Sequence, residues 1–165
     1  MPVVEFDSLP ATARLWIFSA SRPLDHGERD RLLDLVDEFL GQWKAHGHPL
    51  TAARDWRYDR FLLVAVDESA AGASGCSIDA MVRQLDGLER ALGVGLLDHG
   101  PVLFRRAGAI ECLDRQAFAD LARRGDVSPE TIVFNNTLTR VADVRDGRWE
   151  TAASASWHGR AFGLS

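Results

Sequence analysis

The feature that most constrains the fold of this chain is an unbroken run of six apolar residues, Phe61 to Val66. A short apolar run between polar residues is typical of a strand that is buried on both faces. The segment before it, Ala52 to Tyr58, mixes polar and apolar residues, and Asp59-Arg60 separates the two segments. The pattern predicts a hairpin whose first strand is half exposed and whose second strand is fully buried.

Two further segments repeat apolar residues at the spacing of an amphipathic helix. The first begins near Pro23, where Asp25 and Glu28 have the spacing of a capping box, and we expect it to end at Gly47. The second runs from Ile78 to Leu92 and is followed by glycines that would end it. The chain therefore combines the hairpin with two long helices.

Shorter patterns predict strands at 15–18, 101–104, 109–113 and 131–134, and a short helix from Asp114 to Gly125. The first 113 residues then run strand, helix, strand, strand, helix, strand. This succession, with its two most apolar strands first and third, matches a ferredoxin-like βαββαβ core, in which those strands are central. We expect an α+β fold in a single domain, 1–165, with a ferredoxin-like core over 1–113 and a C-terminal α/β extension over 114–165.

Charge and composition exclude several functions. The net charge of -5 and the pI near 5.5 disfavour nucleic-acid binding, because phosphate contacts need a concentrated basic face. Lys44 is the only lysine, and the residues around it, Gln42-Trp43-Lys44-Ala45, do not form a phosphate-binding G-x-x-x-x-G-K-[ST] loop. Walker-type ATP hydrolysis is therefore excluded, as is a lysine Schiff base at any other position.

The N-terminal residues lack the basic start and the apolar run of a signal peptide, and no apolar stretch approaches the ~20 residues of a membrane span. We therefore expect a cytoplasmic protein that does not associate with membranes. In the cytosol Cys76 and Cys112 would be thiols, and their separation excludes a C-x-x-C redox or zinc pair. No cofactor is predicted.

The best candidate site is the segment from Gly72 to Asp79, with the sequence G-A-S-G-C-S-I-D. Cys76 follows a loop of small residues and precedes the second helix, so its thiol is expected near the first helical turn, where backbone N–H groups and the helix dipole stabilise a thiolate. The same N–H groups would suit a bound anion. In the structural alternative, a serine caps the helix and Cys76 is a small buried side chain. Asp79 fits least well, since its charge opposes both a thiolate and an anion.

Two carboxylates, Asp67 and Glu68, follow directly on the most apolar strand. We expect them at the carboxyl end of that strand, near the loop that leads to Cys76. Either one could act as a general base or orient a histidine such as His46. In the alternative, both solvate the strand end or pair with arginine.

Two other groups of residues have weaker patterns. His46-Gly47-His48 resembles the tract by which pterin-synthase-like enzymes hold zinc, but the remaining histidines are scattered and zinc needs three or four protein ligands, so no metal site is predicted. Arg54, Arg57 and Arg60 follow one another along the hairpin and would accept a carboxylate or phosphate as a basic patch. A solvated edge strand is the alternative explanation.

Several short stretches are distinctive: Arg14-Leu15-Trp16-Ile17, Trp43 with Ala45-His46-Gly47, Arg60-Phe61, Val66-Asp67-Glu68, the segment 73–79, Phe134-Asn135-Asn136 and Ser156-Trp157. Together they resemble a small uncharacterised bacterial family, common in the Bacteroidetes, whose members often carry the label ABC transporter ATPase. The serine-glycine-cysteine segment is the most specific part, so the resemblance implies a site there. The ATPase label is not supported, since no Walker lysine is present, and the resemblance implies no particular activity.

These observations lead to two hypotheses. The first is a small-molecule or anion site at the start of the second helix; if it is catalytic, Cys76 is the nucleophile, and Asp67 or Glu68 with His46 is the acid–base group. The predicted ligand-binding residues are Ser74, Gly75, Ser77, Asp79 and Arg60. The second hypothesis is a non-catalytic interaction module, in which the chain forms a homodimer or docks a partner and Trp149 and Trp157 contribute contact area.

Overall fold

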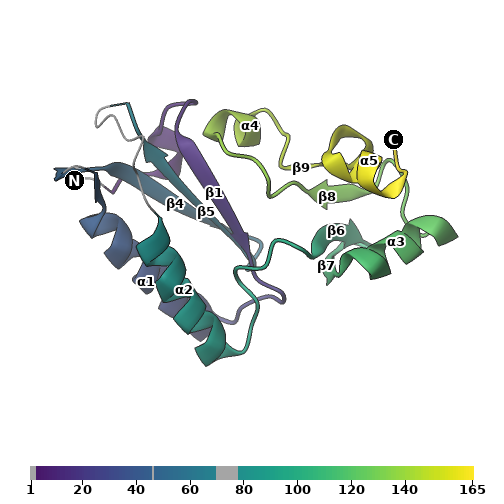
Figure 1. Ribbon diagram of the computed structural model, residues 1–165, viewed down its shortest axis with the longest axis horizontal. Coiled ribbons are helices and arrows are strands. Elements are labelled where there is room, and N and C mark those ends of the chain that lie inside the picture. The colour runs from purple at the N-terminus through teal and green to yellow at the C-terminus, as the bar shows by residue number, and fades with distance from the viewer. Residues whose placement is uncertain (1–2, 46, 70–77) are drawn as a thin grey trace. The chain divides into compact units, whose positions relative to one another are not determined.

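The computed structural model describes residues 3–45, 47–69 and 78–165 of an α+β protein (Figure 1). The chain divides into two compact units. The first comprises Met1–Leu97 and Thr139–Ala142, and the second comprises Asp98–Leu138 and Asp143–Ser165.

The first unit contains one main antiparallel sheet and two long helices. Its elements are a 3-10 helix, η1 (Phe6–Ser8), strand β1 (Arg14–Ser19), helix α1 (His26–Gln42), strands β2 (Lys44–Ala45), β3 (His48–Pro49), β4 (Thr51–Arg57) and β5 (Phe61–Asp67), and helix α2 (Asp79–Leu92). The strand order is β1-β5-β4, with every pair antiparallel. The predicted hairpin of β4 and β5 is therefore confirmed, and β5 is its buried strand.

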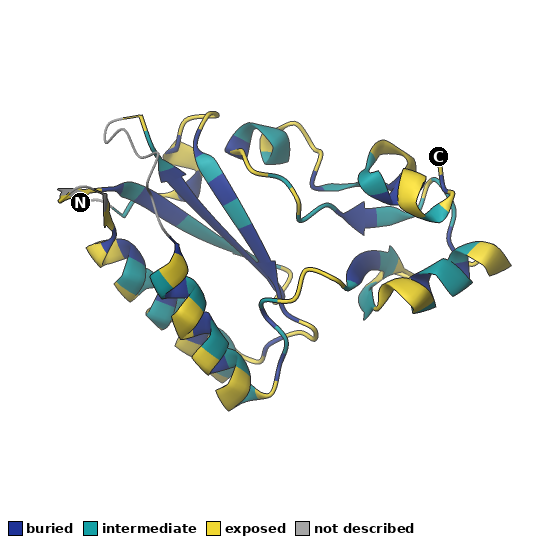
Figure 2. Ribbon diagram, viewed as in Figure 1, coloured by how far each residue is buried: buried dark blue, intermediate teal, exposed yellow. Residues whose placement is uncertain are grey.

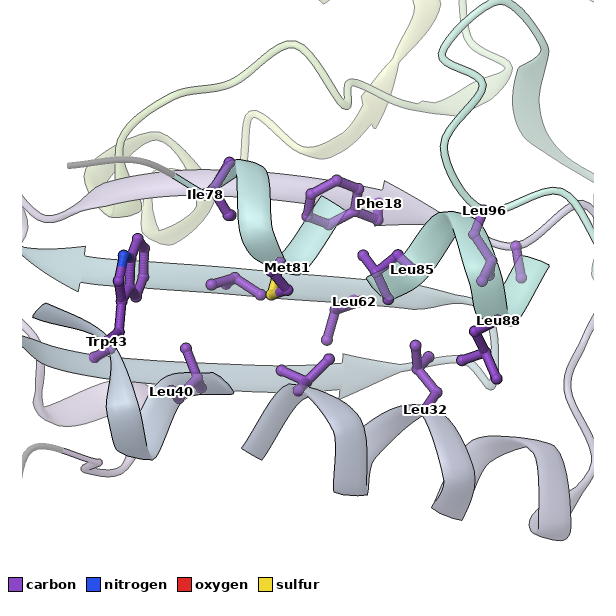
Figure 3. Close-up of a cluster of buried hydrophobic side chains, with 14 of the residues drawn as sticks. Phe18, Leu32, Leu40, Trp43, Leu62, Ile78, Met81, Leu85, Leu88 and Leu96 are labelled. Atoms are coloured by element: carbon purple, nitrogen blue, oxygen red, sulfur yellow. The ribbon is translucent and has the colours of Figure 1, made fainter. Parts of the chain in front are cut away.

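The apolar core of the first unit explains why β5 is central. Helices α1 and α2 cover one face of the sheet, and the core lies between them and the strands (Figures 2 and 3). Side chains labelled in Figure 3 come from β1 and β5 (Phe18, Leu62), from α1 (Leu32, Leu40) and from α2 (Met81, Leu85, Leu88). Phe61–Val66 are at most 2% exposed. A strand that is apolar on both faces is stable only with a neighbour on each side and cover above and below.

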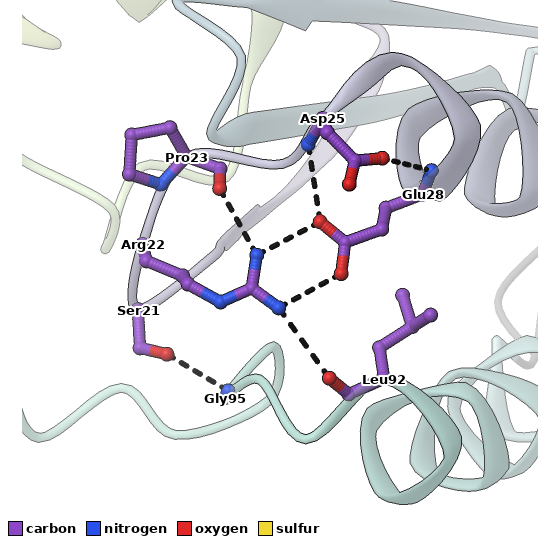
Figure 4. Close-up of polar contacts among 7 residues, drawn as sticks. All are labelled: Ser21, Arg22, Pro23, Asp25, Glu28, Leu92 and Gly95. Carbon is purple, nitrogen blue, oxygen red and sulfur yellow. Dashed lines mark hydrogen bonds and ion pairs between the residues drawn. The ribbon is translucent and has the colours of Figure 1, made fainter.

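Helix α1 begins at a capping box, as the sequence predicts. The Glu28 N–H donates to Asp25 Oδ1 at 2.8 Å, and the Asp25 N–H donates to Glu28 Oε1 at 3.1 Å (Figure 4). Both terminal nitrogens of Arg22 donate to the Glu28 carboxylate at 2.8 Å, and these bonds are the main reason that the pKa of Glu28 is lowered to about 2. Arg22 also donates to the Leu92 carbonyl at 3.4 Å. The loop after β1 thus ties the start of α1 to the end of α2.

The predicted end of this helix at Gly47 is wrong, because α1 ends at Gln42. The chain becomes extended at Trp43 and buries its indole, whose ring centre lies 5.0 Å from that of Phe39 and 5.6 Å from that of Trp16. The two-residue strands β2 and β3 then pair with each other. Gly47, with a φ of +80°, lies between these two strands and does not close the helix.

A short segment, Thr139–Ala142, lies along the edge of β1 that does not pair with β5, and we refer to it as the edge segment. The Leu15 N–H donates to the Thr139 carbonyl at 2.9 Å, and the Val141 N–H donates to the Ala13 carbonyl at 3.0 Å. Arg14 and Arg140 form an isolated antiparallel bridge at this point. The first unit is therefore completed by residues that come late in the chain.

The second unit has its own antiparallel sheet, in the order β7-β6-β8-β9. The elements in this part of the chain are β6 (Val102–Arg106), β7 (Ala109–Leu113), α3 (Arg115–Arg124), β8 (Ile132–Phe134), α4 (Val141–Arg145), β9 (Glu150–Ala152), the 3-10 helix η2 (Ala153–Ala155) and α5 (Trp157–Phe162). The fully buried Phe118 packs edge-on against Phe104 and Phe162, with ring centres 4.8 and 4.9 Å away. The Asp114 side chain accepts from the Ala117 N–H at 2.7 Å, which confirms the predicted cap of α3.

The α+β fold is thus confirmed, but the predicted ferredoxin-like βαββαβ core is not. The strand expected to complete that core, β6, pairs with β7 and β8 and not with β1. The edge segment occupies part of the available edge of β1 instead. The predicted boundary at residue 113 falls between β7 and α3, inside the second unit.

Candidate functional site

The predicted site residues fall into two groups. His46, Ser74, Gly75, Cys76 and Ser77 lie outside the described residues. The structure describes Asp67, Glu68, Asp79 and Arg60. The contacts of these four residues show which of them lie together near Ser69, where the described chain stops before the segment 70–77.

Asp67 and Glu68 lie at the carboxyl end of β5, where the sequence places them. Asp67 Oδ1 accepts hydrogen bonds from the Ser69 backbone N–H at 3.0 Å and from the Ser69 hydroxyl at 2.6 Å. This is an Asx-type turn, in which the side chain shapes the backbone that leaves the strand. Asp67 therefore has a local structural partner.

Glu68 lies between two guanidinium groups. Its Oε2 is 3.9 Å from Arg14 Nη1, and its Oε1 is 3.6 Å from Arg140 Nη1. The two arginines are directly opposite each other in the bridge between β1 and the edge segment. Like charges that face each other across strands repel, so this pair needs a counter-charge. Glu68 provides it, since it lies two residues beyond Val66, the strand partner of Arg14.

The two contacts of Glu68 are long for ion pairs. The pairs Arg22–Glu28 and Arg54–Asp37 each have a nitrogen–oxygen distance of 2.8 Å, within hydrogen-bond range, whereas the distances of 3.6 and 3.9 Å at Glu68 are outside it. Glu68 therefore neutralises part of the positive charge of the two arginines without forming a hydrogen bond to either guanidinium group. The side chains of the two arginines are 40% and 53% exposed, so a ligand can reach both.

Other contacts hold the two arginines in place. The Arg14 guanidinium lies over the Trp16 ring, 4.5 Å from its centre, in a cation–π contact. Arg140 Nη1 is 3.5 Å from the Thr12 carbonyl, at the limit of a hydrogen bond. These contacts and the strand pairing position both cations without using Glu68.

Glu68 and Arg140 line an open hollow of about 540 Å³ in the first unit. Its described lining residues are Ala11, Thr12, Asp67, Glu68, Ser69, Arg140 and Ala142. This volume is within the range of small-molecule sites, which combine apolar surface with a few convergent polar groups. Ser69 is also the last described residue before the segment that carries Cys76.

Arg60 and Asp79 do not line this hollow. Arg60 precedes β5, at the opposite end of the strand from Asp67, and is only 5% exposed; its guanidinium donates to the Ser21 carbonyl at 2.7 Å. Asp79 begins α2 and lines a different hollow, between α1 and α2. The structure thus brings Asp67 and Glu68 together and places Arg60 and Asp79 elsewhere.

The predicted basic patch on the hairpin is divided among separate partners. Arg54 pairs with Asp37 and Arg57 with Asp55, each at 2.8 Å, while Arg60 is buried. Within the described part of the chain, no three His, Cys, Asp or Glu side chains are grouped so that they could hold a metal ion. Cys112 lies half-buried in β7. No described helix is long and apolar enough to cross a membrane.

The pairing of Arg14 with Arg140 is not predicted by the sequence. Arg14 marks the boundary of a predicted strand, and Arg140 belongs to a region with little periodic pattern. Arg140 also contacts the carbonyl of Thr12, which is 128 positions earlier in the sequence. No local spacing can indicate such a contact, although a single arginine before a buried strand is a reason to look for its counter-ion.

The second unit has a separate buried polar group at His158, which is 1% exposed. Its Nδ1 is 2.8 Å from Ser156 Oγ, and its ring stacks on Trp157 with 3.8 Å between ring centres. Burial, followed by the charge of Arg115, lowers the pKa of His158 to about 4. The imidazole is therefore neutral at pH 7.

The fold and the site together define an α+β protein in which Arg14 and Arg140 face each other beside two carboxylates, Asp67 and Glu68, at the end of the central strand. No model of a protein family, no curated protein and no solved structure matches the chain significantly. The resemblance of its short stretches to a bacterial family therefore stays an expectation.

Proposed function

We propose that the chain binds a small anionic molecule at the carboxyl end of β5, between Arg140, which lines the hollow, and Arg14, which contacts Glu68 beside it. The observation that carries this proposal is the cross-strand pair of Arg14 and Arg140, which are accessible and only loosely neutralised by Glu68. An anion between them would accept charge-assisted hydrogen bonds from both. It would also relieve the repulsion between two like charges on neighbouring strands.

Only its position in the sequence connects Cys76 with this proposed site. The segment 70–77 continues the chain from Ser69, which lines the hollow, towards α2. If the site is catalytic, Cys76 is its nucleophile, as its position before a helix suggests.

The finer description of the fold is also a proposal. We treat β1, α1, β4, β5 and α2 as a ferredoxin-like unit in which the edge segment takes part of the place of the fourth strand; the antiparallel order β1-β5-β4 supports this. We place the protein in the cytosol, where both cysteines are thiols.

Isothermal titration of the full chain with acetate and with inorganic phosphate tests the binding proposal. We expect at least one of these anions to bind, and the variant Arg140→Gln to bind it about tenfold more weakly, because one charged hydrogen bond is lost. The matched control is Arg90→Gln, which removes an exposed arginine from the last turn of α2. Binding of neither anion, or equal losses in the two variants, would contradict the proposal.

Alkylation tests the role of Cys76 separately. In the variant Cys112→Ser, Cys76 is the only cysteine, so the rate of its reaction with iodoacetamide can be followed by mass spectrometry at neutral pH. We expect faster reaction than for free cysteine, and slower reaction when the anion is bound. A rate equal to that of free cysteine would remove the nucleophile while leaving the binding site intact.

The alternative of an interaction or homodimerisation module has little support from the predicted tryptophans. Trp149 is 3% exposed and its indole N–H donates to Asn136 Oδ1 at 3.0 Å, while the Arg115 guanidinium covers the ring of Trp157 at 4.9 Å. Light scattering on the full chain distinguishes the two functions. A dimer whose formation is independent of anions would favour the module.

A further inference from the structure

We infer that Glu68 is a built-in competitor for the ligand of this hollow and that the ligand carries a carboxylate group. This inference rests on the proposed function and adds to it the chemical class of the ligand and the way its binding is limited. Glu68 places a carboxylate where the ligand's own carboxylate would bind. The protein thus holds an internal copy of the group that it recognises.

The positions of the two Glu68 oxygens support a carboxylate ligand. One oxygen contacts Arg14 at 3.9 Å and the other contacts Arg140 at 3.6 Å. A single carboxylate group therefore fits between the two guanidinium groups. Backbone hydrogen bonds at 2.9 and 3.0 Å on either side of the arginine bridge fix the distance between their backbones. A ligand carboxylate that enters between them can approach both within hydrogen-bond range, which is the arrangement that arginine favours.

The Glu68 side chain can move away from the two arginines. It follows Asp67, the last residue of β5, and its side chain is 25% exposed. Neither of its two arginine contacts has hydrogen-bond length, in contrast to Glu28, which is held by two bonds of 2.8 Å from Arg22. Exchange of Glu68 for a better-placed carboxylate therefore breaks no close hydrogen bond to the arginines.

The other described residues that line the hollow bear on the chemistry of the rest of the ligand. Ala11 and Ala142 offer small apolar surface, and Thr12 and Ser69 offer polar groups beside it. A short organic acid with an apolar or hydroxylated body fits this lining. A second negative group on the ligand would approach Asp67, which also lines the hollow.

Charge removal at Glu68 tests the inference. We would titrate the full chain with acetate, with lactate and with inorganic phosphate, and compare wild type with Glu68→Gln and Glu68→Ala. If Glu68 occupies the arginines about nine-tenths of the time, its removal raises the affinity for carboxylates about tenfold. Asp86→Asn is the matched control, because it removes one exposed negative charge from α2, where Asp86 pairs with Arg90.

The outcomes separate this inference from the proposed function. A carboxylate affinity that rises in both Glu68 variants and not in Asp86→Asn supports the competitor role. Arginine-dependent binding that is unchanged in both Glu68 variants overturns the inference and leaves the proposed function standing. A larger gain for phosphate than for acetate and lactate overturns the carboxylate class. Absence of binding in all variants overturns the proposed function and this inference together.

Discussion

Lowering the pH from 7 to 4 should destabilise the second unit through one residue, His158. The pKa of this imidazole falls from 6.5 to about 4 in the folded chain, because its ring is buried and Arg115 repels a second positive charge. Between these two values the unfolded chain binds a proton that the folded chain does not. Stability is therefore lost as the pH falls from 6.5 to 4, and His158 causes no further loss below that.

The size of the effect follows from the difference between the two pKa values. Each pKa unit corresponds to about 1.4 kcal/mol, so the upper limit of the loss is roughly 3.5 kcal/mol. Arg115 is exposed and solvent screens part of its repulsion, so we expect about 2 kcal/mol. Unfolding by urea at pH 4, 5, 6 and 7 measures this loss, with circular dichroism as the readout.

A matched pair of variants isolates the contribution of His158. His158→Gln should lose about 2 kcal/mol less than wild type between pH 7 and pH 4, whereas His99→Gln, which removes an exposed histidine from the same unit, should follow wild type. NMR of the ring Cε1–Hε1 group gives the pKa directly, and the His158 signal is assigned by its loss in the first variant. A midpoint near 6.5 in the folded chain would refute the reasoning.

Three other predictions concern a helix cap and two glycine positions. Asp25→Ala removes the cap of α1 and should lower the free energy of unfolding by about 1 kcal/mol in urea, while Asp30→Ala, at an exposed position in the same helix, should have a much smaller effect; equal losses would contradict the role of the cap. Gly159→Ala should destabilise α5 by about 1–3 kcal/mol, because the added Cβ would lie 2.8 Å from the Ala153 carbonyl oxygen. Gly41→Ala in α1, where the added Cβ meets nothing within 4 Å, should stabilise the chain by about 0.5–1 kcal/mol, and a loss there would show that space is not the deciding factor.

Local patterns were sufficient to predict most elements but not the sheets to which they belong. The apolar run at Phe61–Val66 and the capping box of Asp25 and Glu28 depend on neighbouring residues, and both are present in the structure. The pairing of β6 depends on partners that follow it in the chain, β7 and β8, and the order of elements alone does not decide between these and β1. The end of α1 was missed for a related reason, because burial of Trp43 beside Trp16 is a tertiary contact.

The candidate site shows the same division. The position of Asp67 and Glu68 at a strand end follows from the apolar run before them. The partners of Glu68 could not be predicted, since Arg140 reaches it through the pairing of the edge segment with β1. Arg60 was assigned to the site from its charge, yet it is buried against the Ser21 carbonyl, a role that a sequence pattern does not distinguish from ligand binding.

The edge segment has a consequence for how the chain is made. During synthesis the ribosome releases β1 long before Thr139–Ala142. Strands β6, β7 and β8 emerge in between, and during that time one edge of β1 lacks its backbone partner from the edge segment. Unpaired strand edges are where nascent chains associate wrongly. Arg14, on this edge, is a charged residue of the kind that discourages such pairing. The same arginine would then protect the growing chain first and take part in the proposed anion site only after Arg140 has been synthesised.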